Sequence, residues 1–454
     1  GGEIDGLGTS VNSQSGVAYL FSLRSLWTED SFGRVPPRPH QYIVGEGSHC
    51  GGPGYTWLIE NIEATRIAGF AGDQITNIVG IDDFNGDGVD DFAIGAPNAN
   101  GKNGRVYIAF RRGPGLEGDF VLDKLALSPN DPERLTGALI VTDTLDGLGS
   151  SLATGVDFNH DGIFDLVIGS PNADGGVGEI IVVFGDPNLR TPEDGISVDE
   201  LLSTRRADGS PRAARITGNG LDLSGHFGFN VANAGDVDGD GLNDLLIAAP
   251  GATPRFDPDP TDDDDTLTVP GIDANFDGCP DDVSGPNGSP NFNDECTETD
   301  PFDALEGAGL VYIIYGSNRL DLLTTCSGTE IACEVDSDCA DDQFCGLFDF
   351  SVNINQLGKS QLRGFMIAGR REGDRVGGGD AGSVSEGGIE IKAGRGRSNG
   401  LASAGDVDGD GRADILVGSV LADPRVDPNS GLGVQNGGES YLIYGSVIPS
   451  ASPQ

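Results

Sequence analysis

One nine-residue pattern, Asp-x-(Asp/Asn)-x-Asp-Gly-x-x-Asp, recurs four times along the 454 residues of the chain. The copies begin at Asp83, Asp157, Asp236 and Asp406, and each is followed by two apolar segments. Such a repeat is one supersecondary unit that cannot bury both faces alone, so neighbouring units must stack. The pattern therefore predicts one repeat architecture instead of the roughly two to four independent domains that the length alone suggests.

The segments between the copies are typical of β-strands. Apolar runs directly follow the loops at 92–97, 166–171, 245–250 and 415–420, and β-rich segments follow these at 104–110, 178–184, 309–316 and 438–445. Gly, Pro and Asp bound the runs, as they do at turns between strands. The stretch 197–206 is at most a short helix or an outer strand. The chain is therefore predicted to be all-β, with strand meanders packed radially into a β-propeller.

Two short elements flank the Asp-rich loops. Phe227-Gly228 precedes one loop, and Gly95-Ala96-Pro97 follows another. With the loop between such elements, the repeat resembles the FG-GAP family, the calcium-bearing blades of integrin alpha-subunit propellers and of many bacterial surface proteins. Members of that family typically form seven blades, and this sequence is compatible with five to seven. The resemblance implies a single β-propeller over residues 1–454.

The repeat spacing predicts how the propeller is divided. We expect calcium-loop blades at 65–110, 134–184, 215–316 and 347–445. An abbreviated blade is expected at 1–21, because Asp5–Ser10 parallels Asp146–Ser151 but is followed by a strand-like segment without a metal loop. An acidic insertion is expected at 255–306, inside the blade at 215–316, and a Cys-rich insertion at 326–346, between that blade and the next.

The loops are predicted to bind Ca²⁺. This hard cation prefers six to eight oxygen ligands, and a loop can turn several carboxylates inward when a glycine at position 6 permits the sharp bend. Every copy has that glycine, at Gly88, Gly162, Gly241 and Gly411. The candidate ligands at positions 1, 3, 5, 7 (carbonyl) and 9 are Asp83, Asn85, Asp87, Val89 and Asp91; Asp157, Asn159, Asp161, Ile163 and Asp165; Asp236, Asp238, Asp240, Leu242 and Asp244; and Asp406, Asp408, Asp410, Arg412 and Asp414.

Two other structures share the start of this loop pattern: the EF-hand and the solvated Asp-Gly turn. An EF-hand requires Glu at position 12 and a flanking helix on each side. Position 12 is Ile94, Ile168, Ile247 or Val417, each inside an apolar run, so the EF-hand is excluded. Solvated Asp-Gly turns are common. Four copies in matching context disfavour that alternative, because clusters of carboxylates without a counterion repel one another.

A fifth match lies inside the acidic insertion. Its candidate ligands are Asp273, Asn275, Asp277 and Asp281, but no apolar strands flank it, so a fifth calcium site and an acidic disordered loop are both left open. Pairing of Cys279 with Cys296 would staple the insertion. The second cluster, Cys326, Cys333, Cys339 and Cys345, lacks zinc-type C-x₂₋₄-C pairs and favours two disulfides of undetermined connectivity. Cys50 has no evident partner.

Charge and cysteine usage restrict the partners and the compartment. With 72 acidic and 27 basic residues, the net charge of −45 disfavours nucleic acid and anionic membrane surfaces. No apolar stretch is long enough to insert into a membrane. Clustered cysteines are typical of an oxidising compartment. The protein is therefore expected to be exported to the cell surface or beyond, with its signal peptide absent from this chain.

Most common catalytic signatures are missing from the sequence. It contains no H-E-x-x-H or C-x-x-C-H motif, and Gly358-Lys359-Ser360 lacks the upstream glycine of a P-loop. Its single match to G-x-S-x-G lies in a glycine-rich stretch, at Gly396–Gly400. We therefore expect a calcium-stabilised propeller, not an enzyme, that acts in adhesion or interaction or as a self-assembling structural protein, including filament formation. Its partners would be a protein, a polysaccharide or copies of itself. The alternative is a polysaccharide-active enzyme or the accessory propeller of a hydrolase, since paired carboxylates are unrecognisable in so acidic a chain.

Overall fold

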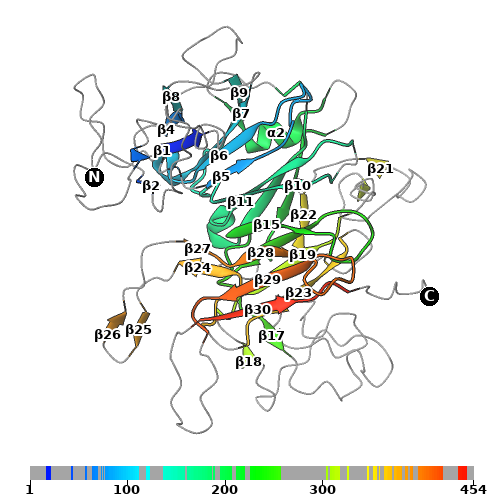
Figure 1. The fold of residues 1–454 in the computed structure, drawn as a ribbon. Helices are drawn as coiled ribbons and strands as arrows, with labels where there is room; N and C mark the ends of the chain where they lie inside the picture. Colours follow the sequence, from blue (N-terminus) through cyan, green and yellow to red (C-terminus); the bar gives the residue numbers. More distant parts are fainter. Residues whose placement is uncertain are drawn as a thin grey trace, which may run out of the picture. The chain divides into compact units, whose positions relative to one another are not determined.

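The structure is a computed structural model, and it confirms the all-β prediction. It describes residues 17–21, 42–43, 57–58, 64–69, 73, 75, 77–111, 119–122, 136–158, 161–186, 188–189, 195–206, 211–219, 225–256, 303–304, 307–316, 325–326, 345–346, 351–354, 357, 362–370, 373–380, 384–386, 389–391, 397–422 and 438–446. The helices in these ranges are short: α1 (Ala99–Lys102), α2 (Val198–Ser203) and a 3₁₀ turn (Ala173–Gly176). All other regular structure in these ranges is β-strand (Figure 1).

The chain divides into two compact units. The first comprises residues 1–149 and 186–198, and it holds two of the larger sheets. One sheet has the order β1 (Val17–Phe21), β4 (Ala64–Gly69), β8 (Asp119–Leu122). The other has the order β13 (Ile196–Ser197), β9 (Thr136–Val141), β7 (Arg105–Phe110), β6 (Phe92–Ala96), β5 (Asn77–Gly80).

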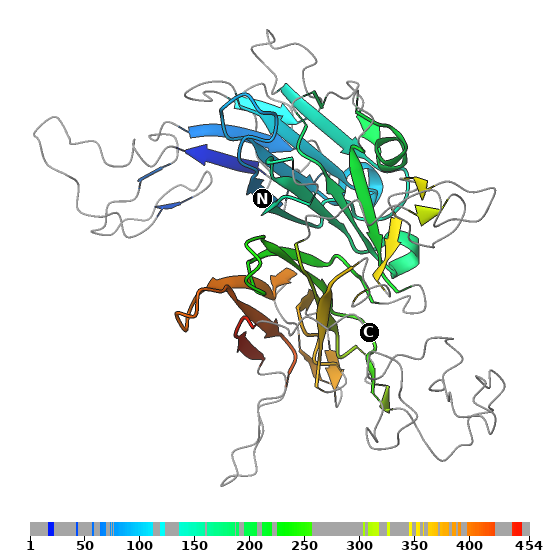
Figure 2. The same ribbon diagram turned by 90° about the vertical axis from the view of Figure 1, so that its right-hand side faces the viewer.

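The second unit comprises residues 150–185 and 199–454 and holds three of the larger sheets (Figure 2). The first is β10 (Ser151–Val156), β11 (Asp165–Ser170), β12 (Glu179–Val183), β14 (Ala213–Thr217), β22 (Ser351–Asn353). The second is β15 (Asn230–Gly235), β16 (Asp244–Ala249), β19 (Leu310–Ile314), β23 (Gly364–Ala368). The third is β28 (Leu401–Gly405), β29 (Asp414–Ser419), β30 (Glu439–Ile443).

Five strand pairs stand apart from the larger sheets. They are β2 (Tyr42–Ile43) with β3 (Trp57–Leu58), β17 (Arg255–Phe256) with β18 (Asp303–Ala304), β20 (Thr325–Cys326) with β21 (Cys345–Gly346), β24 (Gly378–Asp380) with β27 (Arg397–Asn399), and β25 (Val384–Glu386) with β26 (Ile389–Ile391).

Each sheet that carries an Asp-rich loop is an antiparallel meander, as in a propeller blade. The loop joins the first and second strands, and the third strand pairs with the second. The strand at 136–141 pairs with β7 and the strand at 213–217 pairs with β12, so each completes the preceding sheet as its fourth strand. The strand at 64–69 pairs with β1 in the same way. The number of blades stays a prediction.

An additional strand extends three of these sheets. The strands β8, β13 and β22 pair in parallel with β4, β9 and β14. Each follows the third strand of one blade and pairs with the fourth strand of the blade before. The segment 197–206, for which a short helix or an outer strand was expected, forms both: β13 is followed directly by α2.

Apolar side chains fill the space between consecutive sheets of the second unit. One core combines Val167 and Val182 of the β10–β12 sheet with Ile247 of the next sheet, where the rings of Phe227 and Tyr312 meet edge to face at 5.3 Å. A second core combines side chains from β16 and β19 with others from β28 and β29. Strand alternation places both faces of the middle sheet in a core, which is the stacking of propeller blades.

Consecutive blades also meet through their backbones. A small residue on the second strand and a glycine just before the third strand contact a Leu-Gly, Phe-Gly or Val-Gly pair that begins the next blade. We call the two small residues the seat and the pair the FG element. They are Gly95 and Gly104 with Leu148-Gly149, Gly169 and Gly178 with Phe227-Gly228, and Ala248 and Gly309 with Val376-Gly377.

The seats require small residues. A Cβ added at Gly169 would lie 2.1 Å from the carbonyl oxygen of Gly228, far inside van der Waals contact. The Phe227 N–H donates to the Val177 carbonyl at 3.1 Å, which holds the FG element in place. The close approach of two backbones therefore explains the glycines at both the FG and the GAP elements.

Candidate metal centre

The Asp-rich loops share one backbone conformation. The position-6 glycines have φ angles of +87°, +83°, +91° and +91° at Gly88, Gly162, Gly241 and Gly411. Each donates its N–H to the position-1 aspartate, over 2.7, 3.0, 2.9 and 3.0 Å respectively. A side chain would strain this left-handed turn, which is why the pattern requires glycine. In the three loops of the second unit, a β-bulge precedes the loop and turns the chain into it.

The position-9 aspartate ties each loop to the third strand of its blade. In three loops, one carboxylate oxygen accepts the position-2 N–H and the other accepts the N–H of the glycine after the third strand. For Asp244 these donors are Val237 at 2.7 Å and Gly316 at 2.8 Å. Asp91 accepts instead from Asn85 and Arg111. This carboxylate therefore fixes the loop as well as offering oxygen to a cation.

Burial makes three of these carboxyls hard to ionise. Desolvation raises the pKa of Asp91 to about 7 and that of Asp244 to about 7. It raises the pKa of Asp165 well above its usual range. The donated N–H groups lower these pKa values and neighbouring loop aspartates raise them, but burial is the largest cause. A bound cation would compensate the buried negative charge.

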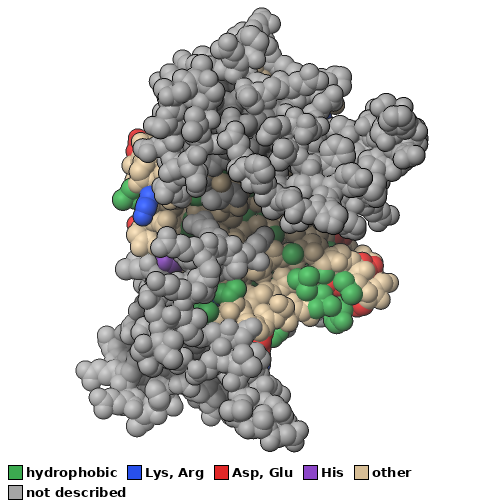
Figure 3. Space-filling model, turned by 60° about the vertical axis from the view of Figure 1, so that its left-hand side comes forward, with side chains coloured by type: hydrophobic (Ala, Val, Ile, Leu, Met, Phe, Trp, Pro, Cys, Tyr) green, Lys and Arg blue, Asp and Glu red, His purple; other side chains and the backbone are tan. Residues whose placement is uncertain are grey.

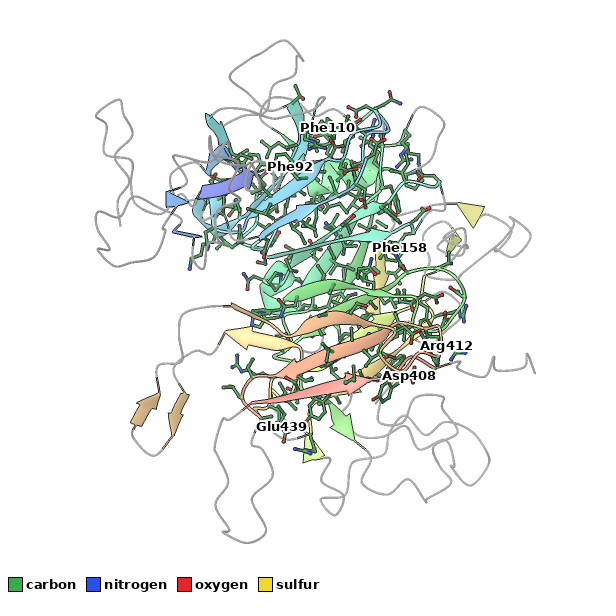
Figure 4. The ribbon with its side chains drawn as sticks, in the orientation of Figure 1. Phe92, Phe110, Phe158, Asp408, Arg412 and Glu439 are labelled. Carbon is green, nitrogen blue, oxygen red and sulfur yellow. The ribbon has the colours of Figure 1, made fainter. Side chains whose placement is uncertain are left out.

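Carboxylate oxygens converge in two of the loops. Asp236, Asp238 and Asp244 bring oxygens within 4.8 Å of one another, and so do Asp406, Asp408 and Asp414. Burial also raises the pKa of Asp238. Figure 4 shows Asp408 and Arg412 on the β28–β29 loop, at the opposite end of the sheet from Glu439. Hard oxygen donors in such a group fit Ca²⁺.

A second observation supports a cation in the Asp157 loop. Its Oδ1 atom is buried and makes no hydrogen bond within the described part of the chain. An unpaired buried carboxylate oxygen is costly, so a ligand there would be stabilising. The residues present therefore fit the calcium that the repeat implies.

The position-5 aspartates face their own loop backbone. Their Oδ1 atoms accept the position-7 N–H over 2.9 to 3.0 Å, as in Val89 to Asp87 and Leu242 to Asp240. Two arginines that sequence reasoning missed also reach the loops: Arg206 lies 3.0 Å from Asp161, and Arg363 lies 3.4 Å from Asp238. Neither arginine belongs to a loop, so the repeat pattern carries no signal for them.

Several predicted ligands lie beyond what the structure describes. Asn159 is one, and the fifth match, Asp273, Asn275, Asp277 and Asp281, is another. The position-7 carbonyls of Val89, Ile163, Leu242 and Arg412 stay predictions. The glycines that bind the position-9 carboxylates were also missed, although each follows an aromatic residue at the end of a third strand, as in Phe184-Gly185, Tyr315-Gly316 and Tyr444-Gly445.

A comparison with protein families identifies the repeat. The model of the FG-GAP repeat matches residues 76–108 and 148–183, which span two of these blades. The chain therefore contains FG-GAP repeats. Its sequence is 30% identical to mouse integrin alpha-8 over 209 residues, 43% of this chain and 17% of the integrin. It is also 31% identical to Drosophila melanogaster integrin alpha-PS5 over 191 residues, 40% of this chain and 16% of the integrin.

Other integrins match to a similar extent. Chicken integrin alpha-V is 29% identical over 203 residues, 43% of this chain and 16% of the integrin. The FG-GAP repeat chain thus matches about a sixth of the length of these relatives. In the described part of the chain, neither helix combines the length and apolar character needed to cross a membrane.

Proposed function

We propose that this FG-GAP repeat protein is an extracellular, calcium-stabilised β-propeller that acts by binding another macromolecule and not by catalysis. The recurring loop geometry carries the proposal: in the described blades, carboxylates are gathered at the first hairpin and one of them is bonded to the third strand. Calcium there would rigidify the hairpin and so hold the surrounding loops as a fixed binding surface.

The comparisons support a binding role. The relatives are integrin alpha subunits, and this likeness supports an adhesion or interaction role for the chain. A protein ligand is therefore the partner we favour, with copies of the chain included. Export agrees with the clustered cysteines and with loops whose weak affinity, typically about 10⁻⁴ to 10⁻³ M in extracellular modules, needs extracellular calcium.

Calorimetric melting in calcium and in EDTA tests the proposal. A site held at about a hundred times its Kd adds about 2.7 kcal/mol to the free energy of unfolding, so chelation should lower the melting temperature by many degrees. Restoring calcium should restore the melt. The variant Asp236→Asn, which weakens one cluster, should lose part of the calcium response. A melt that is the same in EDTA would contradict calcium stabilisation.

A further inference from the structure

One arginine ties the Asp157 loop to the third strand of its own blade. The guanidinium of Arg206 donates to Asp161, the position-5 aspartate, at 3.0 Å and to the Gly185 carbonyl at 2.6 Å. Gly185 lies just after the third strand, β12, and its own N–H donates to Asp165 at 3.0 Å. Arg206 therefore joins the same two elements, the loop and the end of the third strand, that the position-9 carboxylate joins.

Water screens this ion pair less than the comparable pair in the next blade. The Arg206 side chain is 13% exposed, whereas Arg363, which lies 3.4 Å from Asp238, is 56% exposed. Partly buried ion pairs are screened less than exposed ones. Basic side chains are also scarce: the chain has 27 against 72 acidic residues, and they occupy little of the described surface in Figure 3. Among the described residues, Arg206 is thus the best-shielded cation that holds a metal loop from outside that loop.

The Asp157 loop also offers less negative charge than its neighbour. It has aspartate at positions 1, 5 and 9 and Asn159 at position 3, whereas the Asp236 loop has four aspartates. Three of those four bring carboxylate oxygens within 4.8 Å of one another. Three aspartates and one arginine give the Asp157 loop a charge of −2, and four aspartates with Arg363 give the Asp236 loop −3. Because ligand charge sets the affinity of calcium loops, the Asp157 loop should bind calcium more weakly.

We propose that Arg206 is a built-in counterion of the Asp157 loop, which holds this hairpin in place without calcium and weakens calcium binding there. The loop still offers an oxygen to a cation, since the buried Oδ1 of Asp157 makes no hydrogen bond within the described part of the chain. A calcium ion that uses Asp161 must share it with the guanidinium or displace the guanidinium, and the two positive charges repel. The inference rests on the proposed calcium-stabilised function and says which blade depends on calcium least.

This arrangement gives adjacent blades of the second unit different calcium dependence. The sheets that carry the two loops share one apolar core, which includes Val167 and Ile247. A blade that keeps its hairpin without calcium supports that core while the loop of the next blade is empty. Falling calcium therefore releases the Asp236 hairpin and leaves the Asp157 hairpin in place.

Hydrogen–deuterium exchange with mass spectrometry follows each loop separately in the full chain. Peptides that cover 157–165 and 236–244 are measured as free calcium is raised from an EDTA-buffered solution, and their exchange is expressed relative to the unfolded rate. In EDTA, we expect stronger protection of 157–165 than of 236–244, because local exchange reports local opening. The calcium midpoint, the free calcium at half of the added protection, should be lower for 236–244.

Two substitutions of Arg206 separate its charge from its bridge. Arg206→Gln removes both, so the protection of 157–165 in EDTA and the calcium midpoint of that peptide should each fall about fivefold, the upper range for a surface ion pair. Arg206→Lys keeps the charge but lacks the planar fork that bonds Asp161 and Gly185 together. It should lose protection in EDTA and keep the calcium midpoint of the wild type.

Arg215→Gln is the matched control. It removes another ion-paired arginine of the same sheet, which lies 3.0 Å from Glu179, at the other end of β12 from Gly185, and 2.9 Å from Asp199. This variant should leave both readouts of the Asp157 loop unchanged. An equal shift in Arg215→Gln would show that any loss of an arginine from the sheet has the same effect, and would overturn the proposal.

Three other results also overturn the proposal. One is a wild type whose 157–165 midpoint lies at or below that of 236–244, a comparison that needs no variant. The others are an unchanged and a higher midpoint in Arg206→Gln, since the arginine would then only support the structure. If calcium protects neither peptide in the wild type, the proposed calcium stabilisation fails as well. If 236–244 responds to calcium and Arg206→Gln shifts nothing, calcium stabilisation stands and only this inference falls.

Discussion

Calcium binding near neutral pH should release protons, because the buried position-9 carboxyls are hard to ionise without a cation. Asp244 shows this best. It is fully buried, and burial raises its pKa to about 7, while the N–H groups of Gly316 and Val237 lower it by a smaller amount. A carboxylate must be deprotonated to bind a metal, so the proton must leave when calcium enters.

The size of the effect follows from the pKa. The difference between about 7 and the ordinary 3.8 corresponds to about 4 kcal/mol in favour of the neutral carboxyl. At pH 7 such a group is half protonated, so each of Asp91 and Asp244 should release about half a proton when calcium binds. Release should fall toward zero two pH units higher, where the carboxyls are already ionised.

The sign for stability follows from the same values. The pKa of Asp244 is higher in the folded than in the unfolded chain, so the folded state binds more protons between about pH 4 and 7. Without calcium, the contribution of this group is fully present below pH 4 and is lost as pH rises through 7. Added calcium reverses the loss. Calcium should therefore raise the melting temperature more at pH 8 than at pH 5.

Isothermal titration calorimetry measures the proton count directly. Calcium is titrated at pH 7 into the protein in two buffers with different heats of ionisation, and the difference in observed heat gives the protons released. The variant Asp244→Asn, checked for folding by circular dichroism, should release about half a proton less. Equal heats in both buffers would refute the argument, because calcium would then enter loops already fully ionised or not enter them at all.

Three further predictions concern other parts of the molecule. The substitution Gly169→Ala should lower the free energy of unfolding by about 1–3 kcal/mol in urea denaturation, because the added methyl overlaps the neighbouring backbone. Cys326 and Cys345 face each other in the register of β20 and β21, so we expect a disulfide between them, to be found by non-reducing peptide mapping. Replacing Arg363 by Gln removes a cation from beside Asp238 and should tighten calcium binding by about 0.2–1 kcal/mol, measured by calcium titration.

Each of these predictions has a contrary outcome. Gly418→Ala is the control for the first, because its site is open, and equal losses in both variants would show that the seat contact is not the cause. Peptides that link Cys326 to Cys333 or Cys339 would contradict the second. Unchanged or weaker calcium binding in Arg363→Gln would show that the arginine holds the loop in place more than it competes with the cation.

The metal loops could be predicted from sequence because their geometry is local. The position-6 glycine, the position-1 aspartate and their hydrogen bond lie within six residues, so one short pattern specifies them all. The strands were likewise evident from apolar runs. The hydrogen bond between the position-9 carboxylate and the third strand could not be predicted in this way. In the Asp236 loop its donor is the Gly316 N–H, which lies 72 residues from Asp244, across an insertion.

Sequence reasoning also missed how blades are joined. Residues 376–377 carry no Phe-Gly sequence, but the structure shows that Val376-Gly377 is the FG element of the blade whose strand β28 begins only at Leu401. The insertion between them hides the repeat. The role of Val376-Gly377 is evident only from its contact with Ala248 and Gly309. Such a contact between backbones far apart in the sequence leaves no periodic signal.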